Sequence, residues 1–316
     1  MPRISIPDDS PAVLATSAVF PALQARAELD YHDSLPGTED VLIERIGAAE
    51  TVLNIRSSSR FTARVFAACP RLRLLSVWGT GTDHIDLASA AQHAVTVTNT
   101  PGVSARSIAE HALALLFAVA RRIPEMDAAT RLGTWPRGRG IELYGKTCGV
   151  IGYGAIGRQF ARLAAALGMR VVVWTMHPAR YADVEFVELD ELYRTSDVVS
   201  LHLRLSPQTE SFVGAAQFGL MKPGAILINT ARGAIVHEEA LIEALATGGI
   251  AGAGLDVFVA EPLPPHHPLT GLGNVVLTPH CAGITPEALE AGLRMAVDNI
   301  WNFFEGRPKN KAGAGA

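Results

Sequence analysis

Short apolar, β-branched runs alternate with helical patterns along most of this chain of 316 residues. Parallel strands cannot be joined by tight turns and need a crossover, which is usually a helix. Strands in such sheets are buried on both faces, so they are apolar throughout rather than alternating with polar residues. The alternation therefore predicts an α/β fold in which helices cover both faces of parallel sheets.

The strand-like runs fall into two sets, one in each half of the chain. The first set comprises ISI (4–6), ETVLNI (50–55), LRLLSVW (72–78) and VTVTNT (95–100). The helical patterns of this set are 38–47, 62–69 and 86–94, and each opens at a Thr or Asp that can cap a helix. The second set comprises TCGVIG (147–152), RVVVWT (170–175), DVVSLHL (197–203), AILINTA (225–231), AGLDVF (253–258) and VVLTPH (275–280). We expect two doubly wound domains, with a ligand-binding cleft between them.

The boundaries of these domains follow from the connecting segments. NTPG (99–102) has the composition of a hinge. The helical pattern at 107–123 leads into the second set, whereas the last one, 286–306, is long enough to cross back. We therefore expect one domain from residues 1–99 and 287–316 and another from 100–286. The tail KNKAGAGA (309–316) has the composition of a frayed end.

Bulk properties exclude several function classes. The chain has 27 Lys and Arg against 31 Asp and Glu, which gives no electrostatic footprint for nucleic acid. Its longest apolar run, ALALLFAVA (112–120), is far shorter than the ~20 residues of a membrane span, and the N-terminus does not resemble a secretion signal. We expect neither a nucleic-acid nor a membrane partner.

The cysteine and histidine patterns point to no metal centre. Cys69, Cys148 and Cys281 are odd in number and widely spaced, so we interpret them as buried small residues in a reducing compartment, most simply the cytoplasm. His266 and His267 have no acidic or thiol residue at ligand spacing. The sequence therefore predicts no metal ion.

A glycine pattern follows the first strand of the second set. Gly152, Gly154 and Gly157 form GxGxxG, which alone also fits an ordinary tight turn. Here a strand enters the turn and an amphipathic helical pattern leaves it. In that context the first glycine permits the turn, the second lets backbone N–H groups approach a pyrophosphate, and the third lets the helix pack closely. The pattern predicts a dinucleotide-binding Rossmann domain.

The end of the next strand bears on which nicotinamide cofactor is used. An acidic residue there would bind the ribose diol and repel a 2′-phosphate, but this chain has Thr175. His177 and Arg180 follow and can pair with a phosphate, although the segment also suits an ordinary polar loop. We expect NADP or NAD as cofactor, with NADP slightly favoured.

Three strand ends in the second set carry charged residues into loops. Arg232, Glu261 and His280 each have an ordinary interpretation, as surface charges or a satisfied strand-end histidine. Together they supply a cation for a carboxylate, an acid to orient an imidazole and a titratable proton carrier, which a hydride-transfer site needs.

In order and spacing, GYGAIG, LINTARGAIVHEEALIEAL, GLDVFVAEPL and LTPH resemble the D-2-hydroxyacid dehydrogenases. WGTGTDHIDL (78–87) and the segment 99–124 resemble that family's substrate loop and interdomain helix. Within the family, LDVFVAEPLPPHHPL is most similar to the glyoxylate/hydroxypyruvate reductases. The resemblance implies a Rossmann cofactor domain plus a smaller flavodoxin-like substrate domain, and an NAD(P)-dependent oxidoreductase that reduces a small 2-keto acid to the D-2-hydroxy acid.

The resemblance also implies roles for single residues. His280 would donate the proton to the keto oxygen, Glu261 would fix its tautomer and favour its protonated form, and Arg232 would hold the substrate carboxylate. Further positions are implied to bind the substrate or the cofactor. For the substrate these are Gly79, Thr80 and Gly81, and for the cofactor they are Gly154, Ala155 and Ile156 at the pyrophosphate and Thr230, Ala231 and Asp256 at the nicotinamide.

Some positions depart from the family pattern or leave the substrate open. Arg204, after Leu203 at the lip of the cofactor site, stands where many relatives have proline. Trp78 precedes the substrate loop and belongs either to the pocket or to the core. Arg56 and Trp78 are both candidate substrate-binding residues, and their orientation would decide which 2-keto acid is bound.

Other functions share the same fold. A phosphoglycerate dehydrogenase often has an added C-terminal domain, which is not expected here. Formate dehydrogenases typically have Gln where this chain has Glu261. Nucleotide-sensing corepressors keep a similar trio of Arg, Glu and His, but they rely on long disordered flanks to recruit partners, and we do not expect such flanks here. Relatives are commonly dimers through the region of the long interdomain helix, so we expect a homodimer.

Overall fold

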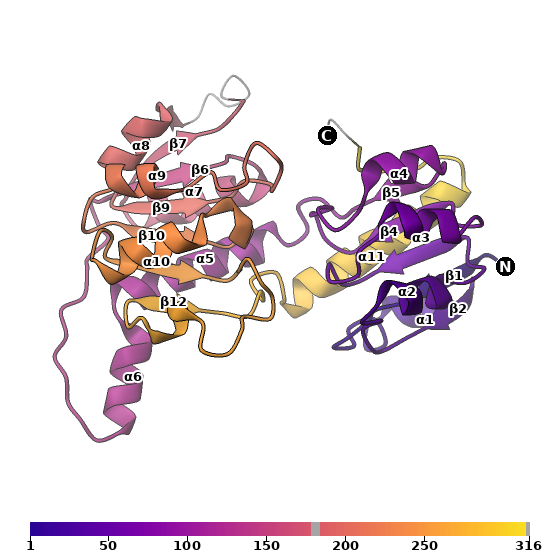
Figure 1. The fold of residues 1–316 in the computed structure, drawn as a ribbon, viewed down its shortest axis with the longest axis horizontal. Helices are drawn as coiled ribbons and strands as arrows, with labels where there is room; N and C mark the ends of the chain where they lie inside the picture. Colours follow the sequence, from indigo (N-terminus) through magenta and orange to yellow (C-terminus); the bar gives the residue numbers. More distant parts are fainter. Residues whose placement is uncertain (178–183, 314–316) are drawn as a thin grey trace. The chain divides into compact units, whose positions relative to one another are not determined.

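The computed structural model describes residues 1–177 and 184–313, and it divides the chain into two compact units. Unit 1 comprises Met1–Ser104 and Ile284–Ala316, and unit 2 comprises Ala105–Gly283. The sequence pattern predicts these junctions at 99/100 and 286/287. Each unit contains one parallel sheet (Figure 1).

The sheet of unit 1 has five strands in the order β2-β1-β3-β4-β5, and every neighbouring pair is parallel. The strands are β1 (Arg3–Ile6), β2 (Glu28–Tyr31), β3 (Thr51–Asn54), β4 (Leu74–Val77) and β5 (Thr96–Thr98). This is the flavodoxin-like strand order, which confirms the predicted fold class for the smaller domain.

Helices cover both faces of this sheet, and a separate apolar core lies under each face. One core contains Leu42, Val65 and Phe66 from helices on one side, and the other contains Leu23 and Leu293. The first side is formed by α2 (Glu39–Ile46), α3 (Ala63–Ala68) and α4 (Leu87–Gln92), and the second by α1 (Val19–Gln24) and α11 (Pro286–Phe304). The last helix of the chain therefore belongs to the unit that contains the N-terminus.

The sheet of unit 2 has seven strands in the order β12-β11-β10-β9-β6-β7-β8, again parallel throughout. The strands are β6 (Thr147–Ile151), β7 (Arg170–Trp174), β8 (Glu185–Phe186), β9 (Val198–Leu201), β10 (Ile226–Asn229), β11 (Gly252–Leu255) and β12 (Val275–Leu277). The order reverses between β6 and β9, as in a Rossmann fold. Ligands bind at the carboxyl ends of the strands beside such a switch point.

Both faces of this sheet are also covered. On one face α5 (Ala105–Ala120) and α7 (Ala155–Ala166) pack with each other and on the sheet. On the other face lie α8 (Leu189–Thr195), α9 (Ala215–Leu220) and α10 (Glu238–Ala246). The helix α6 (Ile123–Arg131) and the short turns η2 (Gly233–Ile235) and η3 (Pro268–Gly271) complete the unit. No helix in the described ranges is long and apolar enough to cross a membrane.

Three local expectations were wrong. The short strands β2 and β8 were missed because both are edge strands and mostly not fully buried, so they lack the apolar signature of central strands. The helical pattern at 107–123 is interrupted: α5 ends at Ala120, Arg122 has a left-handed backbone with φ 52°, and α6 begins at Ile123 with Pro124 in its first turn. Proline suits the first turn of a helix because the N–H groups there have no acceptor within the helix, so its missing N–H costs no hydrogen bond.

The tail was also expected to fray, and its described part does not. Lys311 forms an antiparallel bridge with Thr98, and the N–H of Ala312 donates to the carbonyl of Val97 at 2.9 Å. The Asn310 side chain donates to Asn299 on α11 at 2.9 Å. Backbone pairing with the edge strand β5 therefore holds residues 310–312 in place.

Candidate active site

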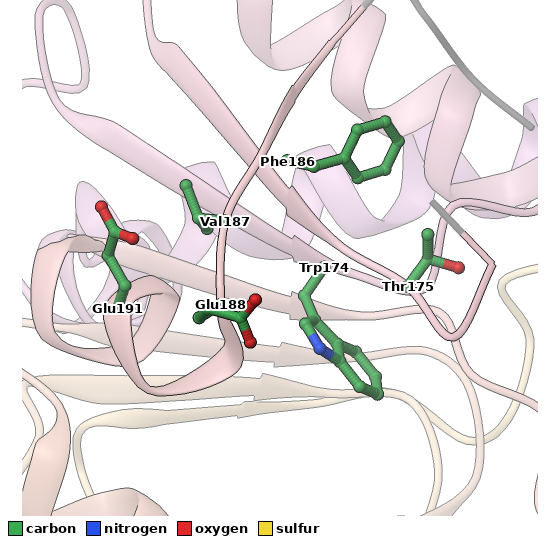
Figure 2. Close-up of a pocket in the computed structure, with 6 residues that line it drawn as sticks. All are labelled: Trp174, Thr175, Phe186, Val187, Glu188 and Glu191. Carbon is green, nitrogen blue, oxygen red and sulfur yellow. The ribbon is translucent and has the colours of Figure 1, made fainter. Parts of the chain in front are cut away.

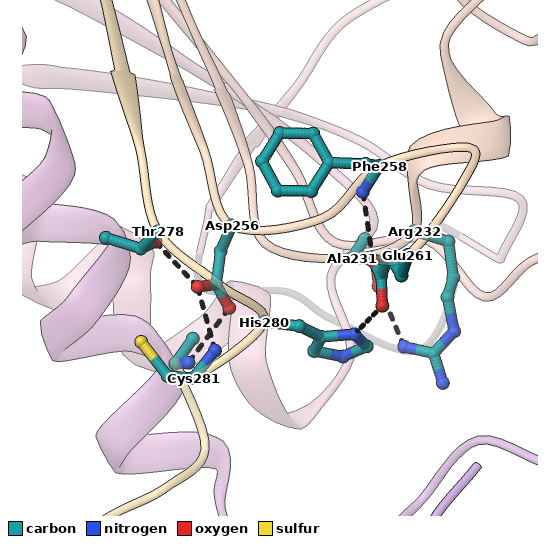
Figure 3. A network of polar contacts seen from close by, with 9 residues as sticks. Ala231, Arg232, Asp256, Phe258, Glu261, Thr278, His280 and Cys281 are labelled. Atoms are coloured by element: carbon teal, nitrogen blue, oxygen red, sulfur yellow. Dashed lines mark hydrogen bonds and ion pairs between the residues drawn. The ribbon is translucent and has the colours of Figure 1, made fainter. Parts of the chain in front are cut away.

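The charged residues predicted to do chemistry lie after three neighbouring strands of unit 2. Arg232 follows β10, Glu261 lies in the loop after β11, and His280 follows β12. These strands are adjacent in the order β12-β11-β10, and because they are parallel their carboxyl ends meet at one sheet edge. Figure 3 shows all three side chains grouped on one side of a polar network.

His280 and Glu261 form a direct pair. His280 Nδ1 lies 2.6 Å from Glu261 Oε2, and Glu261 Oε1 accepts the N–H of Phe258 at 3.0 Å (Figure 3). The ionised carboxylate is an acceptor only, so Nδ1 carries a proton and Nε2 is the ring atom left for a ligand. Both side chains are about one-third exposed, at 37% and 35%. The pair is thus fixed in orientation but open to solvent.

The charge of Glu261 is stabilised by its neighbours. Burial raises the pKa of this carboxyl, but the hydrogen bond and charge of His280, the N–H of Phe258 and the charge of Arg232 outweigh burial, and the pKa lies below its ordinary value. Arg232 is half-buried, and its Nη1 donates to the carbonyl of Ala231 at 2.8 Å. Glu261 therefore remains a carboxylate at neutral pH, beside a fixed cation.

A glycine next to Arg232 lets the two charged loops meet. A Cβ built on Gly233 would lie 2.0 Å from the carbonyl carbon of Phe258 and 2.4 Å from the nitrogen of Val259. Any side chain at this position would push apart the Arg232 loop and the Glu261 loop. Gly233 was not singled out from the sequence, because its role depends on a contact between segments distant in the chain.

A second carboxylate lies deeper on the same edge. Asp256 is fully buried and accepts hydrogen bonds from the Thr278 hydroxyl at 2.6 Å and from the N–H groups of Cys281 and Ala282, each at 2.9 Å (Figure 3). His111 Nε2, from α5, lies 3.5 Å from Asp256 Oδ1. Burial alone would raise the pKa of Asp256, but these hydrogen bonds outweigh it and lower the pKa. Asp256 is thus a buried, ionised group.

The glycine turn has the geometry that a dinucleotide requires. Gly152 has φ +94°, and a Cβ there would lie 2.6 Å from the carbonyl oxygen of His202. A Cβ on Gly157 would lie 2.0 Å from the carbonyl oxygen of Gly152, so the helix approaches the strand too closely for any side chain. Gly154, the N-cap of α7, has open space around it, and Gly154 and Ala155 are exposed. The N-terminus of α7 is therefore accessible to an anion.

Buried polar atoms along the strand ends also fit a bound cofactor. Thr230 Oγ1, just after β10, is buried and has no hydrogen-bond partner among the described residues. His202 Nδ1, just after β9, is likewise buried without a partner in the described chain, and burial lowers the pKa of His202 to about 3. Such atoms normally find a partner, and a ligand with hydrogen-bonding groups would supply one. The residues present therefore fit a nicotinamide dinucleotide.

The end of β7 opens into a hollow of about 300 Å³. Trp174, Thr175, Phe186, Val187, Glu188 and Glu191 line it (Figure 2). Thr175 thus lies at a cavity, as the glycine pattern leads one to expect, but two carboxylates that the sequence analysis did not consider line the same cavity. Of the two predicted phosphate partners, His177 is exposed, and Arg180 lies outside the described residues. Charge in the described part of this hollow is therefore negative.

The lip after β9 has the predicted residues. Leu203 is half-buried against the core, and Arg204 is exposed, with its carbonyl accepting the Thr209 hydroxyl at 2.6 Å. Cys281 departs from the expectation that all three cysteines are buried. It is half-buried because it follows His280 at the open edge of the sheet, whereas Cys69 and Cys148 are in apolar cores.

In unit 1, Trp78 packs against α11. A Cβ built on Gly292 would lie 2.2 Å from Trp78 Nε1, and this atom is buried without a partner among the described residues. Trp78 is half-buried and packs against the core of unit 1, which favours the second of the two interpretations. Arg56 lies after β3 with its guanidinium carbon 5.9 Å from the Trp78 ring centre, and it donates to the carbonyl of Pro11. Both residues are thus tied into their own unit.

The predicted substrate loop, residues 79–81, is held from beneath by Asn99 and Thr100. The N–H of Gly79 donates to the Thr100 hydroxyl at 2.8 Å, and the Asn99 side chain donates to the carbonyl of Thr80 at 2.8 Å. Gly79 has φ +137°, which favours glycine. Because the N–H of Gly79 already has an internal acceptor, Thr80 and Gly81 remain as the predicted donors to a substrate.

Comparisons with known proteins agree with this geometry. The family described as "D-isomer specific 2-hydroxyacid dehydrogenase, NAD binding domain" matches residues 113–282. The chain is 39% identical over 297 residues to a glyoxylate reductase of Korarchaeum cryptofilum, covering 90% of this chain and 89% of that protein. It is 40% identical over 282 residues to a D-3-phosphoglycerate dehydrogenase of Archaeoglobus fulgidus, covering 87% of this chain and 53% of that protein. Among solved structures, an acyclic imino acid reductase in complex with NADPH and D-Arg has a TM-score of 0.91 at 32% identity, covering 99% of this chain and 100% of that one.

Proposed function

This chain belongs to the D-isomer specific 2-hydroxyacid dehydrogenases, NAD-dependent oxidoreductases that act on 2-hydroxy acids, and we propose that it reduces a small 2-keto acid of the glyoxylate or hydroxypyruvate type to the D-2-hydroxy acid. The observation that carries the proposal is the 2.6 Å contact between His280 and Glu261 at the sheet edge where Arg232 also lies. A histidine whose Nδ1 is held by a carboxylate is a proton donor of fixed orientation.

The proposed chemistry uses His280 and Arg232 on one substrate. Arg232 pairs with the substrate carboxylate and stabilises the negative charge that grows on the adjacent carbonyl oxygen. His280 gives the proton on Nε2 to that oxygen, while the imidazole keeps its Nδ1 proton toward Glu261. When bound, a reduced nicotinamide cofactor supplies the hydride that adds to the carbonyl carbon. The product is a 2-hydroxy acid, and His280 is left neutral until it regains a proton from water.

The cofactor would be held at the points that the structure leaves open. We propose that the N–H groups of Gly154, Ala155 and Ile156 bind the pyrophosphate at the N-terminus of α7. The nicotinamide end would then lie by Thr230, Ala231 and Asp256. Thr230 supports this placement, because its buried hydroxyl has no partner among the residues that the structure describes.

We propose that the enzyme accepts both NADPH and NADH, with a modest preference for NADPH. The support is Thr175, which puts no carboxylate at the position that normally excludes a 2′-phosphate. The carboxylates of Glu188 and Glu191 line the same hollow and oppose a phosphate, so we expect the preference to be small. The related imino acid reductase was solved with NADPH.

A substrate panel tests the function. Purified protein is assayed with glyoxylate, hydroxypyruvate and the 2-keto acid of D-3-phosphoglycerate, each with NADH and with NADPH, with and without ammonium. We expect turnover of the first two without ammonium, and a D-configured product from hydroxypyruvate. Preference for the phosphorylated keto acid would favour a phosphoglycerate dehydrogenase. Turnover only with ammonium would favour an imino acid reductase. Nucleotide binding without turnover would favour a nucleotide-sensing binding protein.

We also propose a homodimer that uses the segment 123–144. Its apolar side chains are unusually exposed: Leu132 at 82%, Trp135 at 77% and Tyr144 at 76%. Large exposed apolar residues clustered in one segment commonly mark a protein interface. Light scattering of the purified protein would give twice the chain mass, and a single-chain mass at micromolar concentration would refute the dimer.

All three cysteines are free thiols, which fits a reducing compartment such as the cytoplasm.

A further inference from the structure

Three residues that can bind a metal ion meet behind the catalytic histidine. His111 from α5, Asp256 after β11 and Cys281 after β12 each offer one ligand atom, and these atoms all lie within 4.8 Å of one another. They are far apart in the sequence, so no ligand spacing indicates a site, and we predicted none from the sequence. The fold brings a thiol, an imidazole and a carboxylate to one point.

We propose that His111, Asp256 and Cys281 form a binding site for a divalent cation of the zinc type, and that a cation there blocks the nicotinamide end of the cofactor site. Zinc binds sulfur, imidazole nitrogen and carboxylate oxygen in tetrahedral sites, and three protein ligands leave a fourth position for water. His111 Nε2 and Asp256 Oδ1 are already 3.5 Å apart, close to the spacing of two ligands on one such ion. The blocking effect rests on the proposed function, because it requires the nicotinamide to lie beside Asp256.

The surroundings hold the ligands in place, as outer partners do in metal sites. Asp256 is fixed by the N–H groups of Cys281 and Ala282, which donate to its two carboxylate oxygens. The Thr278 hydroxyl donates to Asp256 at 2.6 Å (Figure 3). The same hydroxyl oxygen lies 2.9 Å from His111 Nε2. The carboxylate is therefore already oriented, and a cation on Oδ1 would take the place of the Thr278 hydroxyl.

Binding requires two proton movements that the residues can make. In the metal-free protein the Thr278 hydroxyl donates its hydrogen bond to Asp256, so its oxygen accepts one from the protonated Nε2 of His111. With a cation bound, His111 would carry its proton on Nδ1 and present the Nε2 lone pair. Cys281 would release its proton to solvent, because a coordinated thiol is deprotonated. Cys281 and His111 are half-buried rather than fully enclosed, so a hydrated ion can reach them.

The test follows cobalt, a spectroscopic substitute for zinc, on the metal-free protein without substrate. We expect Co²⁺ to produce a thiolate-to-cobalt charge-transfer band that equimolar Zn²⁺ abolishes. Cys281→Ser should remove the band and weaken Zn²⁺ binding by roughly 100-fold, at or above the 10–100-fold cost of losing an outer partner. Cys69→Ser, a control in unit 1, should leave both unchanged. Should Cys281→Ser fold poorly, Cys281→Ala repeats the test, and His111→Gln should weaken Zn²⁺ binding as well.

Different results would overturn different parts. No charge-transfer band in the native protein, or a band that persists in Cys281→Ser, would refute the metal site. If Zn²⁺ binds and the affinity for NADPH and NADH is unchanged, the blocking effect is refuted. If Zn²⁺ binds and lowers cofactor affinity but no 2-keto acid is turned over, the proposed function fails while the metal site stands.

Discussion

The carboxyl ends of the parallel strands in unit 2 form a row whose two ends are built differently. At the end formed by β10, β11 and β12, each carboxylate has partners at hydrogen-bond distance: Glu261 has His280 and Phe258, and Asp256 has Thr278, Cys281 and Ala282. At the end formed by β7 and β8, Glu188 and Glu191 line a hollow of about 300 Å³. The first end is preorganised for one reaction, and the second is open to variation in the ligand.

Within the first end, depth separates two carboxylates of similar chemistry. Asp256 is fully buried, whereas the Glu261 side chain is 35% exposed and bonded to a histidine that is itself 37% exposed. A buried ionised group depends on its hydrogen-bond partners, because an uncompensated buried charge is strongly destabilising. The exposed pair can lose and regain a proton in each catalytic cycle. We therefore expect substitutions along this edge to affect different quantities.

The largest effect is expected from His280→Ala. Without the proton donor, the rate of 2-keto acid reduction should fall by ~10²–10⁴-fold, the usual contribution of general acid catalysis. Cofactor affinity, measured by fluorescence titration, should stay within a few-fold of the wild type because the glycine turn is untouched. If the variant retained more than a tenth of the wild-type rate, His280 would not be the acid.

Asp256→Asn should lower stability as well as cofactor affinity. Losing charge-assisted hydrogen bonds should lower the free energy of unfolding by about 1.5–3 kcal/mol at pH 7. Since the folded-state pKa of Asp256 lies below its unfolded value of about 3.9, its contribution is complete above that pH and is lost as pH falls through the folded pKa. The difference between variant and wild type in urea unfolding should therefore shrink at acid pH.

Asp197→Asn is the matched control for this stability prediction. Asp197 also has a lowered pKa and accepts hydrogen bonds from the N–H of Thr147 and from Lys222. It precedes β9, however, so it lies at the amino ends of the strands, away from the carboxyl ends where we place the cofactor. It should lose stability and keep cofactor affinity, whereas Asp256→Asn should lose both. Equal cofactor affinity in the two variants would remove Asp256 from the nicotinamide end.

Glu261→Gln should move the pH profile more than the binding constants. The low pKa of Glu261 keeps it charged across the working range, and this charge stabilises the protonated imidazole beside it. With glutamine, the decline of reduction at high pH should begin at lower pH, while KM for the keto acid changes little. Glu238→Gln, which affects the His267 pair at 3.2 Å, should leave the profile in place. A profile unchanged in Glu261→Gln would contradict the role of the pair.

The smallest effect is expected at the open end. Thr175→Asp adds a carboxylate that binds the ribose diol and repels a 2′-phosphate, so kcat/KM should shift toward NADH by about tenfold, or ~1.4 kcal/mol. Thr175→Asn, whose new side chain has the shape of aspartate but no charge, should not cause this shift. A wild type that prefers NADH tenfold, or an aspartate variant with no shift, would contradict the proposed preference. Glu188→Gln should raise the NADPH preference further if its charge opposes the phosphate.

Local patterns in the sequence were sufficient to predict most of the fold. The central strands of both sheets and the glycine turn were predicted because each depends on apolar runs or on backbone freedom at adjacent residues. The edge strands β2 and β8 were missed because they are mostly not fully buried. Pro124 was an overlooked signal for a break in the helical pattern at 107–123. It lies in the first turn of α6, where proline is common.

The site was predictable where residues follow strands and unpredictable where distant segments meet. Arg232, Glu261 and His280 lie at the ends of adjacent parallel strands, so strand order alone places them on one edge. By contrast, the contact of His111 with Asp256 depends on how α5 packs on the sheet, and the need for glycine at 233 depends on the path of the Phe258 loop. Glu188 and Glu191 line the Thr175 hollow only because β8 pairs with β7.

We propose that His280, held by Glu261, gives its proton to the keto oxygen as hydride arrives. The most direct test is the solvent deuterium isotope effect on a single turnover of hydroxypyruvate with enzyme-bound NADPH. We expect slower cofactor oxidation in D₂O for the wild type, and a much slower turnover in His280→Ala that imidazole in the buffer partly restores. A single-turnover rate in His280→Ala equal to that of the wild type, with the same isotope effect, would contradict it.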